Sequence, residues 1–170
     1  MEKTRIFIAF PLVILVLCFF QGCYSFSGSS LPAHLKTIAI PVFEDRSGAG
    51  IAQYRGDLTG GLARRIESQS TLRTTPSLAS ADALLDGTII SFSDLSSQLT
   101  SKTERAVTNR ITIVVRVSME DRVKKAQIFS QSFVGFADYQ VGNYTAQQQA
   151  IRLALNQIID EIFDRVVSGW

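Results

Sequence analysis

The feature that most constrains the fold is the alternation of apolar and polar residues between positions 107 and 120. The odd-numbered positions are apolar apart from Asn109, and the even-numbered positions are polar apart from Val114. The apolar set is Val107, Ile111, Ile113, Val115, Val117 and Met119. Successive side chains of a strand point to opposite faces of a sheet, so one face here is apolar and the other polar. The pattern predicts a half-buried strand of an antiparallel sheet.

Further strands are predicted on both sides of this one. Residues 122–125 are polar and form a turn, after which residues 127–139 return as the partner strand of a hairpin. Upstream, residues 72–75 and 83–92 read as strands, and the Ser-rich stretch 93–103 reads as a loop or a flexible hairpin tip. Residues 37–43 form a first strand, which should lie at an edge or carry a bulge because Pro41 lacks an N–H group.

Two amphipathic helices complete the pattern. Apolar residues recur at helical spacing from Ile51 to Ile66, and a broader apolar stripe runs from 151 to 167. Gly60-Gly61 inside the first helix predicts a close approach to the sheet, while Thr145 with Gln148 predicts a capping box on the second. The fold class is therefore α+β. Two helices pack on a largely antiparallel four- to five-stranded sheet, in the order β-α-β-β-β-β-α, within a single domain over residues 32–170.

The first 22 residues read as a targeting segment. Lys3 and Arg5 precede 15 uncharged residues, fewer than the ~20 that a membrane-spanning helix needs, so residues 1–22 are predicted to be a signal peptide. The sequence at residues 20–23, Phe-Gln-Gly-Cys, resembles a bacterial lipobox, which implies a diacylglycerol and N-acyl lipid on Cys23. Residues 23–31 would then form the lipidated tether. The alternative is a general signal peptide with an incidental Cys23.

Composition argues against several functional classes. Lys and Arg total 17 against 15 Asp and Glu with no polybasic run, which disfavours nucleic-acid binding. His34 is the single histidine, so a metal site built on several histidines is excluded, and we expect His34 to be a solvated loop residue. Glu44 and Asp45 are adjacent on an extended chain and point apart, which is unsuited to acid–base catalysis. No catalytic residue, metal or cofactor is therefore assigned.

Basic side chains are the remaining candidates for binding. Lys102 and Arg105 flank the Ser-rich loop, and Arg110 and Arg116 share the polar face of the long strand. Guanidinium and ammonium groups on one surface could bind phosphates or a partner's carboxylates. The alternative is an ordinary solvated outer face.

The mature chain as a whole resembles the LptE family of lipopolysaccharide-assembly lipoproteins. The resemblance covers nearly all of residues 19–167. The residues that carry it are Gly-Cys-Tyr-Ser-Phe-Ser-Gly at 22–28, Leu-Pro at 31–32, His-Leu-Lys-Thr-Ile-Ala-Ile-Pro-Val-Phe at 34–43, Leu-Thr at 58–59 and Ala-Asp-Ala-Leu-Leu-Asp-Gly-Thr-Ile at 81–89.

This resemblance implies a non-enzymatic protein, anchored in the outer membrane, that plugs an LptD-like β-barrel and helps to move lipopolysaccharide to the outer leaflet. Lys102 and Arg105, followed by Arg110, are the expected lipopolysaccharide-binding residues. A generic envelope lipoprotein that scaffolds another complex or binds another ligand is the main alternative. A periplasmic hydrolase is the third hypothesis.

Overall fold

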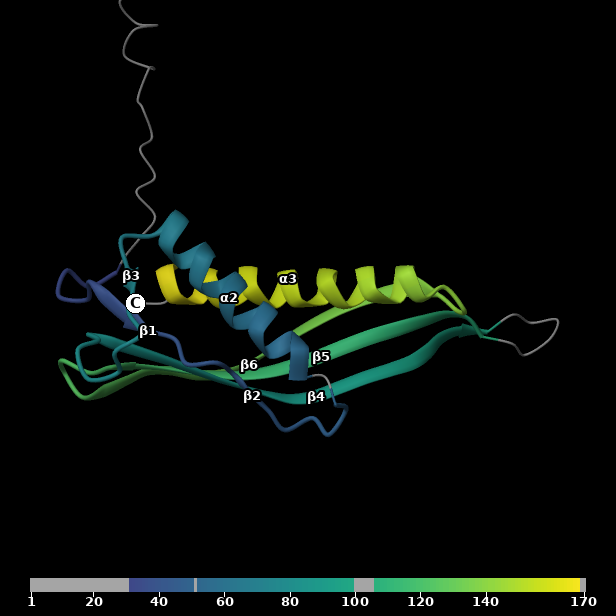
Figure 1. The fold of residues 1–170 in the computed structure, drawn as a ribbon, viewed down its shortest axis with the longest axis horizontal. Coiled ribbons are helices and arrows are strands. Elements are labelled where there is room, and N and C mark those ends of the chain that lie inside the picture. Colours follow the sequence, from purple (N-terminus) through teal and green to yellow (C-terminus); the bar gives the residue numbers. More distant parts are fainter. Residues whose placement is uncertain (1–30, 51, 100–105, 169–170) are drawn as a thin grey trace, which may run out of the picture.

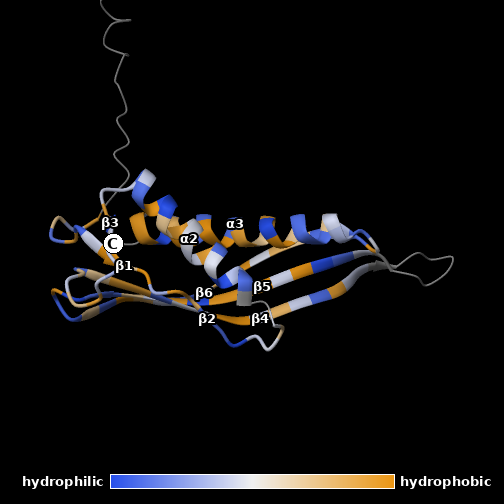
Figure 2. Ribbon diagram, viewed as in Figure 1, coloured by the Kyte–Doolittle hydropathy of each residue, from blue (hydrophilic) through white to orange (hydrophobic). Residues whose placement is uncertain are grey.

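The structure, a computed structural model, describes residues 31–50, 52–99 and 106–168 and consists of two layers. One layer is a six-stranded sheet, and the other is formed by helices α2 (Ala52–Gln69) and α3 (Tyr144–Ser168), which cover the same face of the sheet (Figure 1). Apolar residues gather where the helices face the sheet (Figure 2). The predicted α+β class is confirmed. In the described part of the chain, neither helix has the combination of length and hydrophobicity that crossing a membrane requires.

Three long antiparallel strands dominate the sheet: β4 (Ala83–Leu99), β5 (Ala106–Asp121) and β6 (Ala126–Gln140). The alternating pattern of β5 explains its place between β4 and β6 in the sheet, because its side chains from Ile111 to Met119 are buried at every odd position. The predicted hairpin between β5 and β6 is confirmed, with its turn at residues 122–125. Strand β4 continues to Leu99, so the predicted loop over 93–103 is wrong for residues 93–99.

The N-terminal strand differs from the prediction. Residues 37–43 do not form one strand: β1 (Thr37–Ala39) ends before Pro41, and β2 (Glu44–Asp45) begins after it. Strand β1 lies between β3 (Arg73–Thr74) and β4 and is parallel to both, whereas β2 pairs in parallel with β4 further along. The sheet is therefore mixed, with one more strand than the largest number predicted.

A register shift in β4 keeps its apolar side chains in the core. The shift lies between Ile89 and Ser91, and beyond it Phe92 is opposite Ile113. A one-residue bulge exchanges the two faces of a strand, so Phe92, Asp94 and Ser96 face the helices up to the next register shift, after Ser96. Without the bulge, Phe92 would lie on the uncovered side of the sheet.

The start of α3 also differs from the prediction. Asn143 is its N-cap, since the side-chain Oδ1 of Asn143 accepts a hydrogen bond from the N–H of Ala146 at 3.0 Å. Gln148, predicted to belong to a capping box with Thr145, instead accepts a hydrogen bond from the hydroxyl of Tyr54 at 2.9 Å. This bond links α2 to α3. The predicted apolar stripe is confirmed, with nine buried side chains on α3.

Two glycines set the spacing of the layers. A β-carbon at Gly135 of β6 would lie 2.1 Å from the carbonyl oxygen of Ala154, so α3 rests directly on the strand backbone. A β-carbon at Gly61 of α2 would lie 2.6 Å from Cδ1 of Ile159. The close approach predicted for Gly60-Gly61 therefore exists, but its neighbour is α3 and not the sheet.

Candidate functional site

The candidate site is the face of the sheet opposite the helices, which no described element covers. Strand alternation points the even-numbered side chains of β5 and β6 to this face. Cross-strand rows follow from the register. One row contains Thr88, Arg116 and Ser132, and another contains Leu95, Arg110 and Asp138. The prediction that Arg110 and Arg116 share a face is confirmed. They are six residues apart on one strand, roughly 20 Å, so they cannot bind the same phosphate.

Arg110 is held by a neighbouring carboxylate. Its Nε and Nη2 donate to the two carboxylate oxygens of Asp138 at 2.7 and 2.9 Å. This hydrogen-bonded pair lowers the pKa of Asp138 and raises that of Arg110. The guanidinium also lies 4.9 Å from the centre of the Phe136 ring, which is a cation–π arrangement. The guanidinium of Arg110 is therefore held in place, and two of its N–H groups are already bound to Asp138.

Apolar side chains surround this pair on the uncovered face. Leu95 is 67% exposed, Phe136 is 48% exposed and Val134 is 43% exposed. The register puts Leu95 next to Arg110, Phe136 next to Thr112, and Val134 next to Val114. An apolar patch beside fixed charges is suited to an amphipathic ligand. Lys102 and Arg105, the other predicted binding residues, lie outside the described residues, between the end of β4 and the start of β5.

A polar cluster supports this end of the sheet from the helix side. Asp94 accepts hydrogen bonds from the Tyr139 hydroxyl at 2.6 Å, from the Gln147 amide at 2.7 Å and from the Asn109 amide at 3.0 Å. Burial, together with the hydrogen bond to Asp94, raises the pKa of Tyr139. Sequence analysis missed this cluster. The one signal for it was Asn109, the only polar residue among the apolar positions of its strand.

His34 is a structural residue. Its Nε2 lies 2.6 Å from Oδ2 of the buried Asp121, and its side chain is only 28% exposed, so the expectation of a solvated histidine was wrong. Burial alone would raise the pKa of Asp121, but hydrogen bonds from the Lys124 N–H and from His34 outweigh it and leave that pKa lowered. The pair fastens the segment before β1 to the end of β5.

The remaining acidic candidates have ordinary structural partners. Glu44 forms an ion pair with Arg46 at 2.6 Å, and Asp45 accepts hydrogen bonds from the N–H and hydroxyl of Ser47. Across the described residues, no group of three or more His, Cys, Asp and Glu side chains is arranged to hold a metal ion.

Comparison with solved structures shows that this fold recurs in bacterial proteins. A protein from Xanthomonas campestris superposes with a TM-score of 0.62 at 13% identity, covering 83% of this chain and 91% of its own. A hypothetical protein from Chlamydia trachomatis gives 0.55 at 13% identity, covering 78% and 98%. A minor lipoprotein from Acinetobacter baumannii gives 0.51 at 14% identity, covering 81% and 95%. At these identities the likeness shows the fold alone.

Sequence comparison identifies the family. A search of curated protein sequences gives no match. The family model for LptE, described as lipopolysaccharide-assembly, matches residues 35–166. This range runs from the loop before β1 to the last turns of α3 and includes every strand of the sheet. The chain therefore belongs to the LptE family of lipopolysaccharide-assembly proteins.

Proposed function

We propose that the protein is a lipoprotein of the outer membrane that plugs and supports an LptD-like β-barrel and helps to deliver lipopolysaccharide to the outer leaflet. The observation that carries this proposal is the family match over residues 35–166, which includes every strand and nearly all of both helices. The family's role in lipopolysaccharide assembly needs no catalytic group, and the two-layer fold provides a binding surface instead.

The dimensions of the molecule support a position that crosses the membrane inside a barrel. The 16 residues of β5 extend over roughly 50 Å. A bilayer with its headgroups measures about 40–45 Å. Strand β1 pairs with the start of β4, whereas the ends of β4 and β5 that flank residues 100–105 lie at the opposite end of the sheet (Figure 1). An anchor on Cys23 would join the chain on the side of β1, and the far end of the hairpin lies roughly 50 Å from that end of the sheet.

The chemistry of the uncovered face suits a barrel lumen. Two neighbouring rows carry only polar side chains on β5 and β6, with Ser118 opposite Ser130 and Arg116 opposite Ser132. The interior wall of a large outer-membrane barrel is polar, so a plug gains more from hydrogen bonding there than from apolar contacts.

The far end of the hairpin suits the amphipathic lipopolysaccharide molecule. Leu95 and Phe136 offer apolar area to acyl chains, and Lys102 and Arg105 supply ammonium and guanidinium groups for lipid A phosphates. Arg110 ranks below these two, because Asp138 already occupies its fork.

The test is purification of the tagged protein from membranes in a mild detergent, followed by mass spectrometry of the proteins that accompany it. We expect a large β-barrel protein in a one-to-one ratio. A folded, lipidated protein that brings no barrel would refute the plug role and favour a generic envelope lipoprotein.

A further inference from the structure

A groove runs between α2 and α3 on the outer side of the helical layer. Two adjoining hollows of about 430 and 310 Å³ form it, and they share Gly61, Arg64, Asn156 and Ile159 in their walls. The helices separate this groove from the uncovered sheet face, so it is distinct from the site described above. Nothing in the proposed function requires it.

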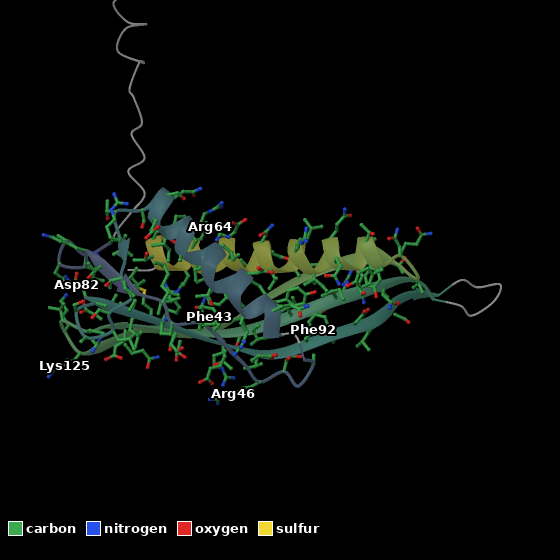
Figure 3. All side chains as sticks on the ribbon, viewed as in Figure 1. Phe43, Arg46, Arg64, Asp82, Phe92 and Lys125 are labelled. Atoms are coloured by element: carbon green, nitrogen blue, oxygen red, sulfur yellow. The ribbon has the colours of Figure 1, made fainter. Side chains whose placement is uncertain are left out.

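Glycines create the space in which a guanidinium sits. A β-carbon at Gly60 would lie 3.3 Å from Nη1 of Arg64, and one at Gly61 would lie 4.0 Å from its Nη2. The guanidinium of Arg64 therefore lies over Gly60 and Gly61, two of the three glycines of α2. Figure 3 shows Arg64 at the point where α2 passes α3. The absence of side chains at 60 and 61 keeps the groove open around this charge.

The groove carries more positive charge than its own carboxylates neutralise. Arg64, Arg65 and Arg152 line it together with Asp57 and Asp160. Arg65 pairs with Asp160 at 2.7 Å, but its Nε is buried without an acceptor. Among the described residues, no acidic side chain lies within ion-pair distance of Arg64 or Arg152.

The guanidinium N–H groups of the groove are suited to an acceptor with two adjacent oxygens. A guanidinium presents parallel N–H groups that match two oxygens of a phosphate, and the exposed side chains of Arg64 and Arg152 offer such groups at this groove. We propose that the α2–α3 groove binds a phosphate-bearing anion, with Arg64 and Arg152 as the charged ligands and the Asn156 amide as a neutral donor. Arg64, Arg65 and Arg152 against Asp57 and Asp160 leave the groove with one net positive charge, which suits a small phosphate-bearing anion better than a long polyanionic chain.

The test uses the full-length lipidated protein in an uncharged detergent. Inorganic pyrophosphate is titrated by isothermal calorimetry at low salt, against wild type and an Arg64→Gln, Arg152→Gln double variant. We expect saturable binding that weakens about tenfold or more in the double variant, because hydrogen bonds to charged groups are lost. The matched control is Lys124→Gln with Lys125→Gln, which removes two charges from the β5–β6 turn at the end of the sheet (Figure 3). It should change affinity less than twofold.

A second titration replaces pyrophosphate with phosphatidylglycerol in mixed micelles and so separates the two sources of phosphate. Binding of both ligands assigns the groove to lipid headgroups, and binding of pyrophosphate alone assigns it to soluble phosphate. Asn156→Asp, which adds one negative charge to the groove, should weaken either interaction. The proposal is overturned if wild type binds neither ligand, or if the lysine control loses as much affinity as the arginine variant. Barrel copurification tests the proposed function separately and does not depend on these results.

Discussion

Replacement of Gly135 by Ala tests how closely the helical layer rests on the sheet. The new β-carbon would lie 2.1 Å from the carbonyl oxygen of Ala154, whereas ordinary contact begins at 3.4 Å, so α3 has to move outward by roughly 1.3 Å. The obstructing atom belongs to the helix backbone and cannot rotate away. Overpacking of this kind costs about 1–3 kcal/mol, occasionally more, and the strand preference of Ala over Gly offsets only about 0.5–1 kcal/mol.

We therefore expect Gly135→Ala to destabilise the protein by about 2 kcal/mol, which lowers the unfolding midpoint by about 4–8 °C for a chain of this size. Thermal unfolding followed by circular dichroism measures this shift. Gly56→Ala is the matched control, because Gly56 lies on α2 with nothing within 4 Å of its added β-carbon. It should stabilise by about 0.5–1 kcal/mol. A Gly135→Ala midpoint equal to or above that of wild type would show that α3 does not rest on the strand.

Three further perturbations address the anchor, the ligand and the acid sensitivity of the fold. Cys23→Ala should release the protein from membranes, and uptake of labelled palmitate by this variant would contradict the lipobox prediction. Lys102→Glu with Arg105→Glu should weaken lipopolysaccharide binding about tenfold or more while barrel copurification persists, and unchanged binding would mean that both residues are merely solvated. The carboxylate of Asp82 accepts hydrogen bonds from the N–H groups of Lys36 and Thr37 and from the Thr37 hydroxyl, and these bonds lower its folded-state pKa below 3.8. The ionised carboxylate therefore stabilises the fold above that pH, and this stabilisation is lost as the pH falls further. Asp82→Asn should cost about 2 kcal/mol at pH 7 and flatten the acid limb of a stability–pH curve, and an unchanged acid limb would exclude this role.

The elements with strong periodicity were predictable from the sequence alone. The alternation around Ile113 and the stripe along α3 specify which face each element buries, and the structure confirms both. Strands were predicted where β1 and β3 lie, within residues 37–43 and 72–75, but their parallel pairing was not, because two- or three-residue pairings carry no periodic signal. Thr37 and Arg73, for example, pair only because the rest of the domain brings them together.

The state of Arg110 shows why the candidate site was only partly predictable. The β5–β6 turn pairs Asp121 with Ala126, and that register, if continued, would put Arg110 opposite Ala137. A bulge next to Met119 shifts the register by one residue and puts Arg110 opposite Asp138 instead. Alternation therefore predicted the face on which Arg110 lies. Alternation could not predict that Asp138 is the partner of Arg110, because the local sequence carries no signal for the bulge.

The position of β1 between β3 and β4 has a consequence for the order of folding. The hairpins β4–β5 and β5–β6 close over short connections, whereas Ile38 pairs with Ala83 some 45 residues further along the chain. Loop-closure entropy rises with this separation, so local hairpins form before distant pairings. The segment next to the predicted lipid anchor therefore docks late, onto a sheet already assembled from residues 83–140. Pulse-labelled hydrogen exchange during refolding should protect amides of β5 before those of β1, and simultaneous protection would contradict this order.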